Sequence, residues 1–130
     1  MQEALNNILA QEIRRALSIG LELNKIAPEC TMINARSVYG CCRIKNGVYR
    51  ICISKPYVEL APLEEIRTVI AHEIAHAVKG GCGHKGEWQT AVKKLREAYD
   101  YAAADYHLTP NPYSKNRQDY PHTPLPRIKK

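Results

Sequence analysis

Apolar residues recur at helical spacing near the start of the chain and predict a first helix over residues 2–20. Gly20 stands where such a helix would end. A face this regular favours packing against a core, and docking of a partner is the alternative. The face consists of Leu5, Ile8, Leu9, Ile13, Ala16 and Leu17.

A small antiparallel sheet is expected over residues 30–54, where the pattern changes from helical to alternating. Asn46-Gly47 is a strong signal for a hairpin with a two-residue loop, and an earlier strand is expected around residues 32–39. The loop sets a register that places four residues on the buried face, namely Cys42, Ile44, Tyr49 and Ile51.

The same register puts Arg43 opposite Arg50 on the exposed face, with Lys45 nearby. Like charges opposite each other in a sheet are unfavourable, so something has to offset the repulsion. Two solvated arginines that splay apart are one explanation, and a surface that faces a nucleic-acid backbone is the other.

A second amphipathic segment begins within residues 59–65 and predicts a helix that Gly80-Gly81 ends. Pro62 suits its first turn, and Lys79 suits its last turn. Its predicted core stripe is Leu63, Ile66, Ile70 and Ile74.

A last helix is expected from Gly86 to His107. Residues 109–130 contain five prolines and almost no apolar residues, so we expect them to be extended or disordered. The chain of 130 residues is therefore expected to form one α+β domain over residues 1–108, followed by a Pro-rich basic tail. The core stripe of the last helix is Trp88, Val92, Leu95, Tyr99, Ala102 and Tyr106.

Residues 72–76 read His-Glu-Ile-Ala-His and carry the candidate chemistry. On a helix, His72 and His76 share one face and can offer two imidazole nitrogens to one metal ion. Glu73 lies between them and can take a proton from water at that metal. The histidines lie about 200° around the helix from the isoleucines, so we expect them to face a cleft.

A catalytic zinc needs a third protein ligand and one open position. His84 is the preferred candidate, because the glycines at 80, 81 and 83 let the chain turn back toward the helix. Cys82 is the rival ligand, since a thiolate also binds zinc, and Glu87 is a third candidate.

The segment 72–88, His-Glu-Ile-Ala-His-Ala-Val-Lys-Gly-Gly-Cys-Gly-His-Lys-Gly-Glu-Trp, resembles the SprT-like (Spartan-type) metallopeptidase domain. That family reads H-E-x-x-H, a turn of variable length, and a histidine followed four residues on by an aromatic. The resemblance covers roughly residues 1–107 and implies a minimal zincin-like fold. It implies one zinc ion held by His72, His76 and His84, with Glu73 as the catalytic base and Trp88 as the motif aromatic.

Two departures from the family pattern are visible. The glycine that usually follows the third histidine directly stands at Gly86, and the chain has no CxxC pair for a C-terminal zinc ribbon. The chain therefore resembles the short, stand-alone members that phages and bacteria often encode. A metzincin is excluded, because Lys79 and Cys82 occupy the positions of its glycine and third histidine.

The resemblance implies a zinc-dependent metallopeptidase that hydrolyses peptide bonds, and the family's best-known members suggest DNA-associated or DNA-crosslinked proteins as substrates. Two alternatives stay open. One is a catalytically silent zincin-fold module that binds DNA or a protein. The other is a zinc hydrolase that acts on a non-protein amide.

The composition indicates a cellular compartment and suggests DNA as a second partner. Five cysteines without a secretory signal favour reduced thiols in the cytoplasm of a bacterium or an infected host cell, and no apolar run reaches the length of a membrane span. The net charge is +6, of which residues 109–130 carry +4, from five basic residues and one acidic residue. Such a tail, together with Arg43, Lys45 and Arg50, could bind DNA without sequence preference.

Overall fold

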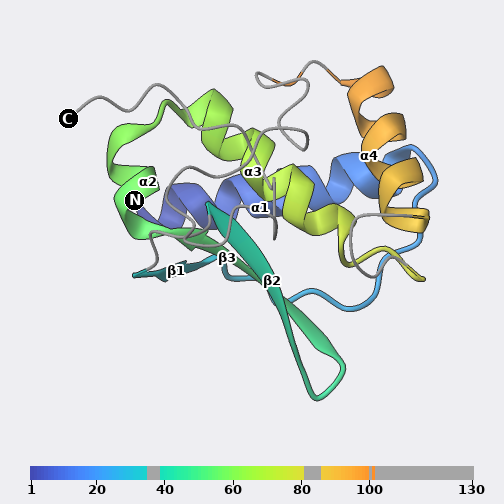
Figure 1. The fold of residues 1–130 in the computed structure, drawn as a ribbon, viewed down its shortest axis with the longest axis horizontal. Helices are drawn as coiled ribbons and strands as arrows, with labels where there is room; N and C mark the ends of the chain where they lie inside the picture. The colour runs from blue at the N-terminus through green and yellow to red at the C-terminus, as the bar shows by residue number, and fades with distance from the viewer. Residues whose placement is uncertain (35–38, 81–85, 100, 102–130) are drawn as a thin grey trace.

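The computed structural model describes residues 1–34, 39–80, 86–99 and 101. These residues form an α+β fold, as predicted, with an N-terminal helix, a three-stranded sheet and three further helices. Helices α1 and α3 pack together, and α3 also contacts the sheet (Figure 1). The elements are α1 (Gln2–Ser18), β1 (Thr31–Ile33), β2 (Gly40–Lys45), β3 (Val48–Ser54), α2 (Lys55–Leu60), α3 (Leu63–Ala75) and α4 (Glu87–Ala98).

Helix α1 ends at Ser18, two residues before the predicted end, and Gly20 has the role expected of it. Gly20 has φ +89°, and its N–H donates to the Leu17 carbonyl at 3.1 Å. The Leu21 N–H donates to the Ala16 carbonyl, which completes a Schellman cap. The predicted apolar face is buried except for the partly buried Ile13 and for Leu17, which is 53% exposed.

The sheet has the strand order β1-β3-β2, and its hairpin has the predicted register. Lys45 pairs with Val48, and Arg43 pairs with Arg50. The expectation of an antiparallel sheet is wrong for β1, which runs parallel to β3. The reason is that β2 lies at the far edge, so the hairpin returns β3 to the centre, beside β1 and in the same direction.

The predicted buried face of the hairpin is covered only at its base. Ile51 is buried, Cys42 and Tyr49 are half-buried, but Ile44 is 61% exposed, so its placement in the core is wrong. The loop end of the hairpin extends away from the helices (Figure 1). Asn46 and Gly47 both adopt positive φ, at 53° and 76°, as a two-residue loop of this type requires.

The helix predicted over residues 72–76 begins and ends at other residues than the sequence pattern indicated. Residues 55–60 form a separate helix, α2, whose first turn is capped by the Ser54 hydroxyl. Pro62 is the N-cap of α3 rather than part of its first turn. Ile66, Ile70 and Ile74 are buried, but Leu63 is 54% exposed, because it lies at the start of α3.

Helix α3 ends at Ala75, before the predicted end near Lys79. The next residues pair with the segment after α1 instead of continuing the helix. The Lys79 N–H donates to the Glu22 carbonyl at 2.9 Å, and the Asn24 N–H donates to the Ala77 carbonyl at 2.8 Å. These tertiary hydrogen bonds replace the helical ones that the sequence pattern favoured.

Helix α4 ends at Ala98 rather than at His107, because Tyr99 adopts an extended conformation. Trp88, Val92 and Leu95 of its predicted stripe are buried. Ala102 and Tyr106 lie outside the described residues, as do His84, Cys82 and the predicted tail. No described helix is long and apolar enough to cross a bilayer.

Helix α1 is joined to α3 by a buried carboxylate that sequence reasoning missed. Glu12 is 1% exposed, and its Oε2 accepts from Arg67 of α3 at 2.7 Å. Arg15 lies 3.3 Å from the same oxygen, and the Tyr101 hydroxyl donates to Oε1. A charge this deep is stabilised only with such partners, which fix α3 relative to α1.

Candidate metal centre

The His-Glu-Ile-Ala-His segment lies at the C-terminal end of α3. His72 and Glu73 are in the last turn, and His76 is the C-cap, with its N–H donating to the Glu73 carbonyl at 3.1 Å. His72 and Glu73 are fully buried, and His76 is half-buried. The predicted one-turn spacing therefore places both imidazoles at the same end of α3, with one of them closer to solvent.

The three side chains converge on one point. One ligand atom from each of His72, Glu73 and His76 lies within 4.8 Å of the others. His72 Nε2 is 4.0 Å from Glu73 Oε2, and the two imidazole rings are 5.4 Å apart. Zinc in proteins takes imidazole nitrogens as ligands, and His72 and His76 supply two of them beside the carboxylate of Glu73, so the residues present fit that ion.

Trp88, from the first turn of α4, forms one wall of this centre. Its ring lies edge-on to His72, with centroids 5.0 Å apart, and stacks on His76 at 5.3 Å. Its indole N–H donates to the His72 carbonyl at 3.5 Å. The sequence singled out Trp88 as a motif aromatic and a core residue, and the structure adds that it packs against both histidines.

Strand β2 lies against α3 on the other side of Glu73. A Cβ added to Gly40 would lie 3.3 Å from Glu73 Cγ and 2.9 Å from Val69 Cγ1. It would also lie 2.9 Å from the Cys52 carbonyl oxygen of β3. Only a glycine fits where the edge strand touches the helix, and sequence reasoning missed this contact because it joins residues that are distant in the chain.

The thiols of Cys41 and Cys42 also lie near Glu73. Burial, and to a smaller extent the Glu73 charge, raises the pKa of Cys42 to about 12. Among the described residues, the convergent ligand group is His72, Glu73 and His76, and it includes no cysteine.

The proposed third ligand remains a prediction. His84 and its rival Cys82 lie outside the described residues. Glu87, the third candidate, is exposed at the start of α4 and is not part of the convergent group.

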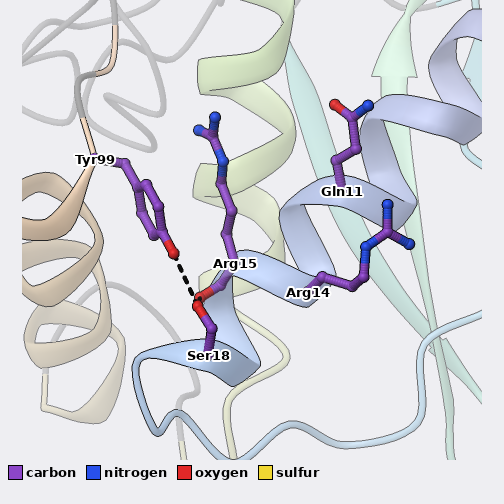
Figure 2. A pocket seen from close by; sticks show the side chains of 5 residues that line it. All are labelled: Gln11, Arg14, Arg15, Ser18 and Tyr99. Carbon is purple, nitrogen blue, oxygen red and sulfur yellow. Dashed lines mark hydrogen bonds between the residues drawn. The ribbon is translucent and has the colours of Figure 1, made fainter.

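A separate open cavity of about 390 Å³ lies between α1 and the end of α4 (Figure 2). Its lining residues are Gln11, Arg14, Arg15, Ser18 and Tyr99. The Tyr99 and Ser18 hydroxyls are hydrogen-bonded at 2.8 Å, and the Arg15 guanidinium lies 4.6 Å from the centre of the Tyr99 ring. Tyr99 therefore links α4 to α1.

Comparison with known families agrees with this geometry. The SprT-like family matches residues 5–108, which is most of the chain. No curated protein matches it.

Proposed function

This chain belongs to the SprT-like family, and from that premise we propose that it is a zinc-dependent metallopeptidase with a zincin-like fold that hydrolyses peptide bonds. The observation that carries the proposal is the convergence of His72, Glu73 and His76 at the end of α3. Two imidazoles and a carboxylate in this arrangement are the parts that metal-assisted hydrolysis requires.

The roles follow from position. His72 and His76 would hold the zinc ion, with His84 as the proposed third ligand. When bound, zinc would polarise the scissile carbonyl and make water a nucleophile at neutral pH. Glu73 would take the proton from the attacking water and deliver it to the nitrogen of the leaving amine. Trp88 would hold both imidazole rings in orientation through its contacts with them.

The edge strand β2 offers a place for an extended peptide. Among the strands that the structure describes it is an outer one, so one side of its backbone can pair with an added strand. Gly40 places this strand directly against Glu73. A peptide that pairs with β2 would therefore pass close to the proposed base.

Replacement of Glu73 tests the proposal. Protein purified without a metal-affinity tag should contain one zinc ion per chain, and Glu73→Gln should keep that zinc. Its rate of cleavage of a denatured protein should fall by about 10²–10⁴-fold, the usual contribution of a general base. Zinc analysis and peptide release measure the two effects.

Two further variants serve as controls for the ligand set. His84→Ala should lose zinc, whereas Cys82→Ala should retain it. Full activity of Glu73→Gln would show that the base assignment is wrong. Absence of zinc after reconstitution would contradict the metal proposal itself.

A role on DNA is the second candidate, and the hairpin favours it. Arg43 and Arg50 are paired across β2 and β3, and both are exposed, as is Lys45. A phosphate backbone would offset the repulsion between the two arginines, so we propose that single-stranded DNA binds along this face. The cleavage assay run with and without single-stranded DNA at rising salt tests the idea, and no binding at low salt would remove it.

A further inference from the structure

Two cysteines face each other across the hairpin, beside the proposed active site. Cys41 of β2 is directly opposite Cys52 of β3, and both are free thiols. Cys41 is half-buried, whereas Cys52 is 1% exposed. A thiol pair in this position has no part in the proposed hydrolysis, so it requires an explanation of its own.

The pair stands at a hydrogen-bonded position of the ladder. The backbone of Tyr49 bonds to Lys25 and Ala27, away from β2, and the Ser54 N–H donates to Tyr39, on the β2 side. Because strand residues alternate, the backbone of Cys52 also faces β2. Opposite Cα atoms at such a position are about 5.5 Å apart, which lies within the range that a disulfide spans.

The two thiols already interact. A hydrogen bond from Cys41 lowers the pKa of Cys52, although burial opposes the shift, and the positive charge of Arg43 adds to it. The same hydrogen bond and burial raise the pKa of Cys41. The pair therefore loses its first proton from Cys52, and the resulting thiolate can then accept the proton of Cys41.

We propose that Cys41 and Cys52 form a reversible disulfide with a small-molecule disulfide as oxidant, and that this bridge inactivates the centre at Glu73. Cys41, the more accessible thiol, passes its proton to the Cys52 thiolate as its sulfur attacks one sulfur of oxidised glutathione, whose S–S bond breaks and releases one glutathione thiolate. That thiolate takes the proton back from Cys52 and leaves as reduced glutathione. The thiolate of Cys52 then attacks the Cys41 sulfur and releases the second. The two cysteines lose two protons and two electrons, which leave on two reduced glutathione molecules.

Closure of the bridge would move β2. Opposite Cβ atoms in a sheet are about 4.5–5.5 Å apart, whereas a disulfide needs them about 3.8 Å apart. The Cα atoms are already within reach, but the two Cβ atoms must approach each other by about 1 Å, which twists β2 locally at Cys41. A disulfide under such strain is easily reduced again, as a reversible modification requires.

Gly40 transmits this movement to the active site. It is the residue before Cys41, and it lies so close to Cys52, Val69 and Glu73 that a Cβ added to it would collide with them. A local twist of β2 at Cys41 therefore displaces the contact with Glu73. This part of the inference rests on the proposed role of Glu73 as the base.

The chain contains a matched control for the test. Cys42 is the next residue of β2 and is also half-buried, but its partner across the hairpin is Ile51 rather than a cysteine. Cys42→Ser therefore removes a nearby thiol without removing the proposed bridge. Cys41→Ser removes the bridge and leaves the buried Cys52 in place.

The experiment compares the wild type, Cys41→Ser and Cys42→Ser after equilibration of the zinc-loaded protein with oxidised glutathione. Peptide mapping should find a Cys41–Cys52 bridge in the wild type and in Cys42→Ser. The emission of Trp88, the only tryptophan, should change in the same two proteins, because its ring contacts both histidines. Their peptidase rate should fall by about 10²-fold, the usual effect of a 1 Å misplacement, and recover with a phosphine reductant.

The readouts separate this inference from the proposed function. A glutathione adduct on Cys41 alone, or a Cys30–Cys52 bridge, would overturn the assignment of the pair. A Cys41–Cys52 bridge that leaves both Trp88 emission and the peptidase rate unchanged would overturn the coupling to the centre. If the reduced wild type cleaves nothing, the proposed function fails, while peptide mapping and Trp88 emission still decide whether the bridge forms and reaches α3.

Discussion

Individual residues determine how closely the elements around Glu73 can approach. Gly40 and Trp88 lie against the motif from two different elements, one from the edge strand and one from α4. Gly40 contributes by having no side chain, and Trp88 contributes a large buried ring. Together they confine the end of α3 to one position.

Replacement of Gly40 with alanine should therefore disturb both stability and activity. The new Cβ would lie 2.9 Å from the Cys52 carbonyl oxygen, which is backbone and cannot move aside at low cost. Overpacking of this kind costs about 1–3 kcal/mol of unfolding free energy. We also expect a lower peptidase rate per folded molecule, measured beside urea unfolding.

Gly47→Ala is the matched control for this prediction. Gly47 has open space around it but a φ of +76°, so alanine should cost about 1–2 kcal/mol through backbone strain alone. Because the hairpin loop is distant from Glu73, its peptidase rate should not change. Equal rates in the two variants would contradict the packing argument.

At the scale of elements, the position of α3 depends on its link to α1. Glu12 accepts hydrogen bonds from Arg67 of α3 and from Tyr101, which follows α4. One buried carboxylate thus joins three segments of the chain. The amphipathic patterns predict that helices pack, but this link fixes which faces meet.

Glu12→Gln keeps the shape of the side chain and removes its charge. Arg15 and Arg67 would then face a neutral amide, and we expect a loss of about 2 kcal/mol of unfolding free energy, as for a hydrogen bond to a charged group. Urea denaturation measures this loss. Arg14→Ala, at an exposed position on the same helix, should change stability by no more than about 0.5 kcal/mol.

At the scale of the whole molecule, the burial of a cysteine thiol and two tyrosine hydroxyls makes the fold less stable at alkaline pH. Burial raises the pKa of Cys30 from 9.0 to about 12, and burial also raises the pKa values of Tyr57 and Tyr101. Each folded pKa lies above its unfolded value. The stabilisation is therefore complete below about pH 9 and is lost as the pH rises toward 12.

The free energy of unfolding should accordingly fall as the pH rises from about 9 toward about 12. Cys30→Ala should reduce the slope of that fall, whatever its effect on stability at neutral pH. Urea unfolding at several pH values measures both slopes. Identical slopes in the two proteins would show that Cys30 does not contribute to the pH dependence.

Local signals predicted the features that depend only on neighbouring residues. Asn46-Gly47 fixed the hairpin and its register, because only residues that tolerate positive φ form that loop. The one-turn spacing of His72 and His76 placed two ligands at one end of a helix, and the chain's membership of the SprT-like family agrees with the resemblance seen in the motif. The cap that Gly20 forms at the end of α1 also depends only on neighbouring residues.

The errors occurred where distant segments compete with local preference. Helix α3 ends early because residues 77 and 79 bond to the segment after α1, and β1 is parallel because β3 inserts between β1 and β2. Ile44 is exposed because the loop end of the hairpin extends away from the helices (Figure 1). A periodic pattern shows that a residue can be buried but not which element will cover it.

The sequence by itself therefore determined the first helix, the hairpin with its register and the two histidines with the carboxylate between them, because each depends on spacing along one segment. Only the tertiary structure decided that Gly40 touches Glu73, that Trp88 packs on both histidines and that Glu12 joins α1 to α3. Each of these contacts joins segments that are far apart in the chain. Their geometry depends on how the whole core packs, and no local pattern encodes it.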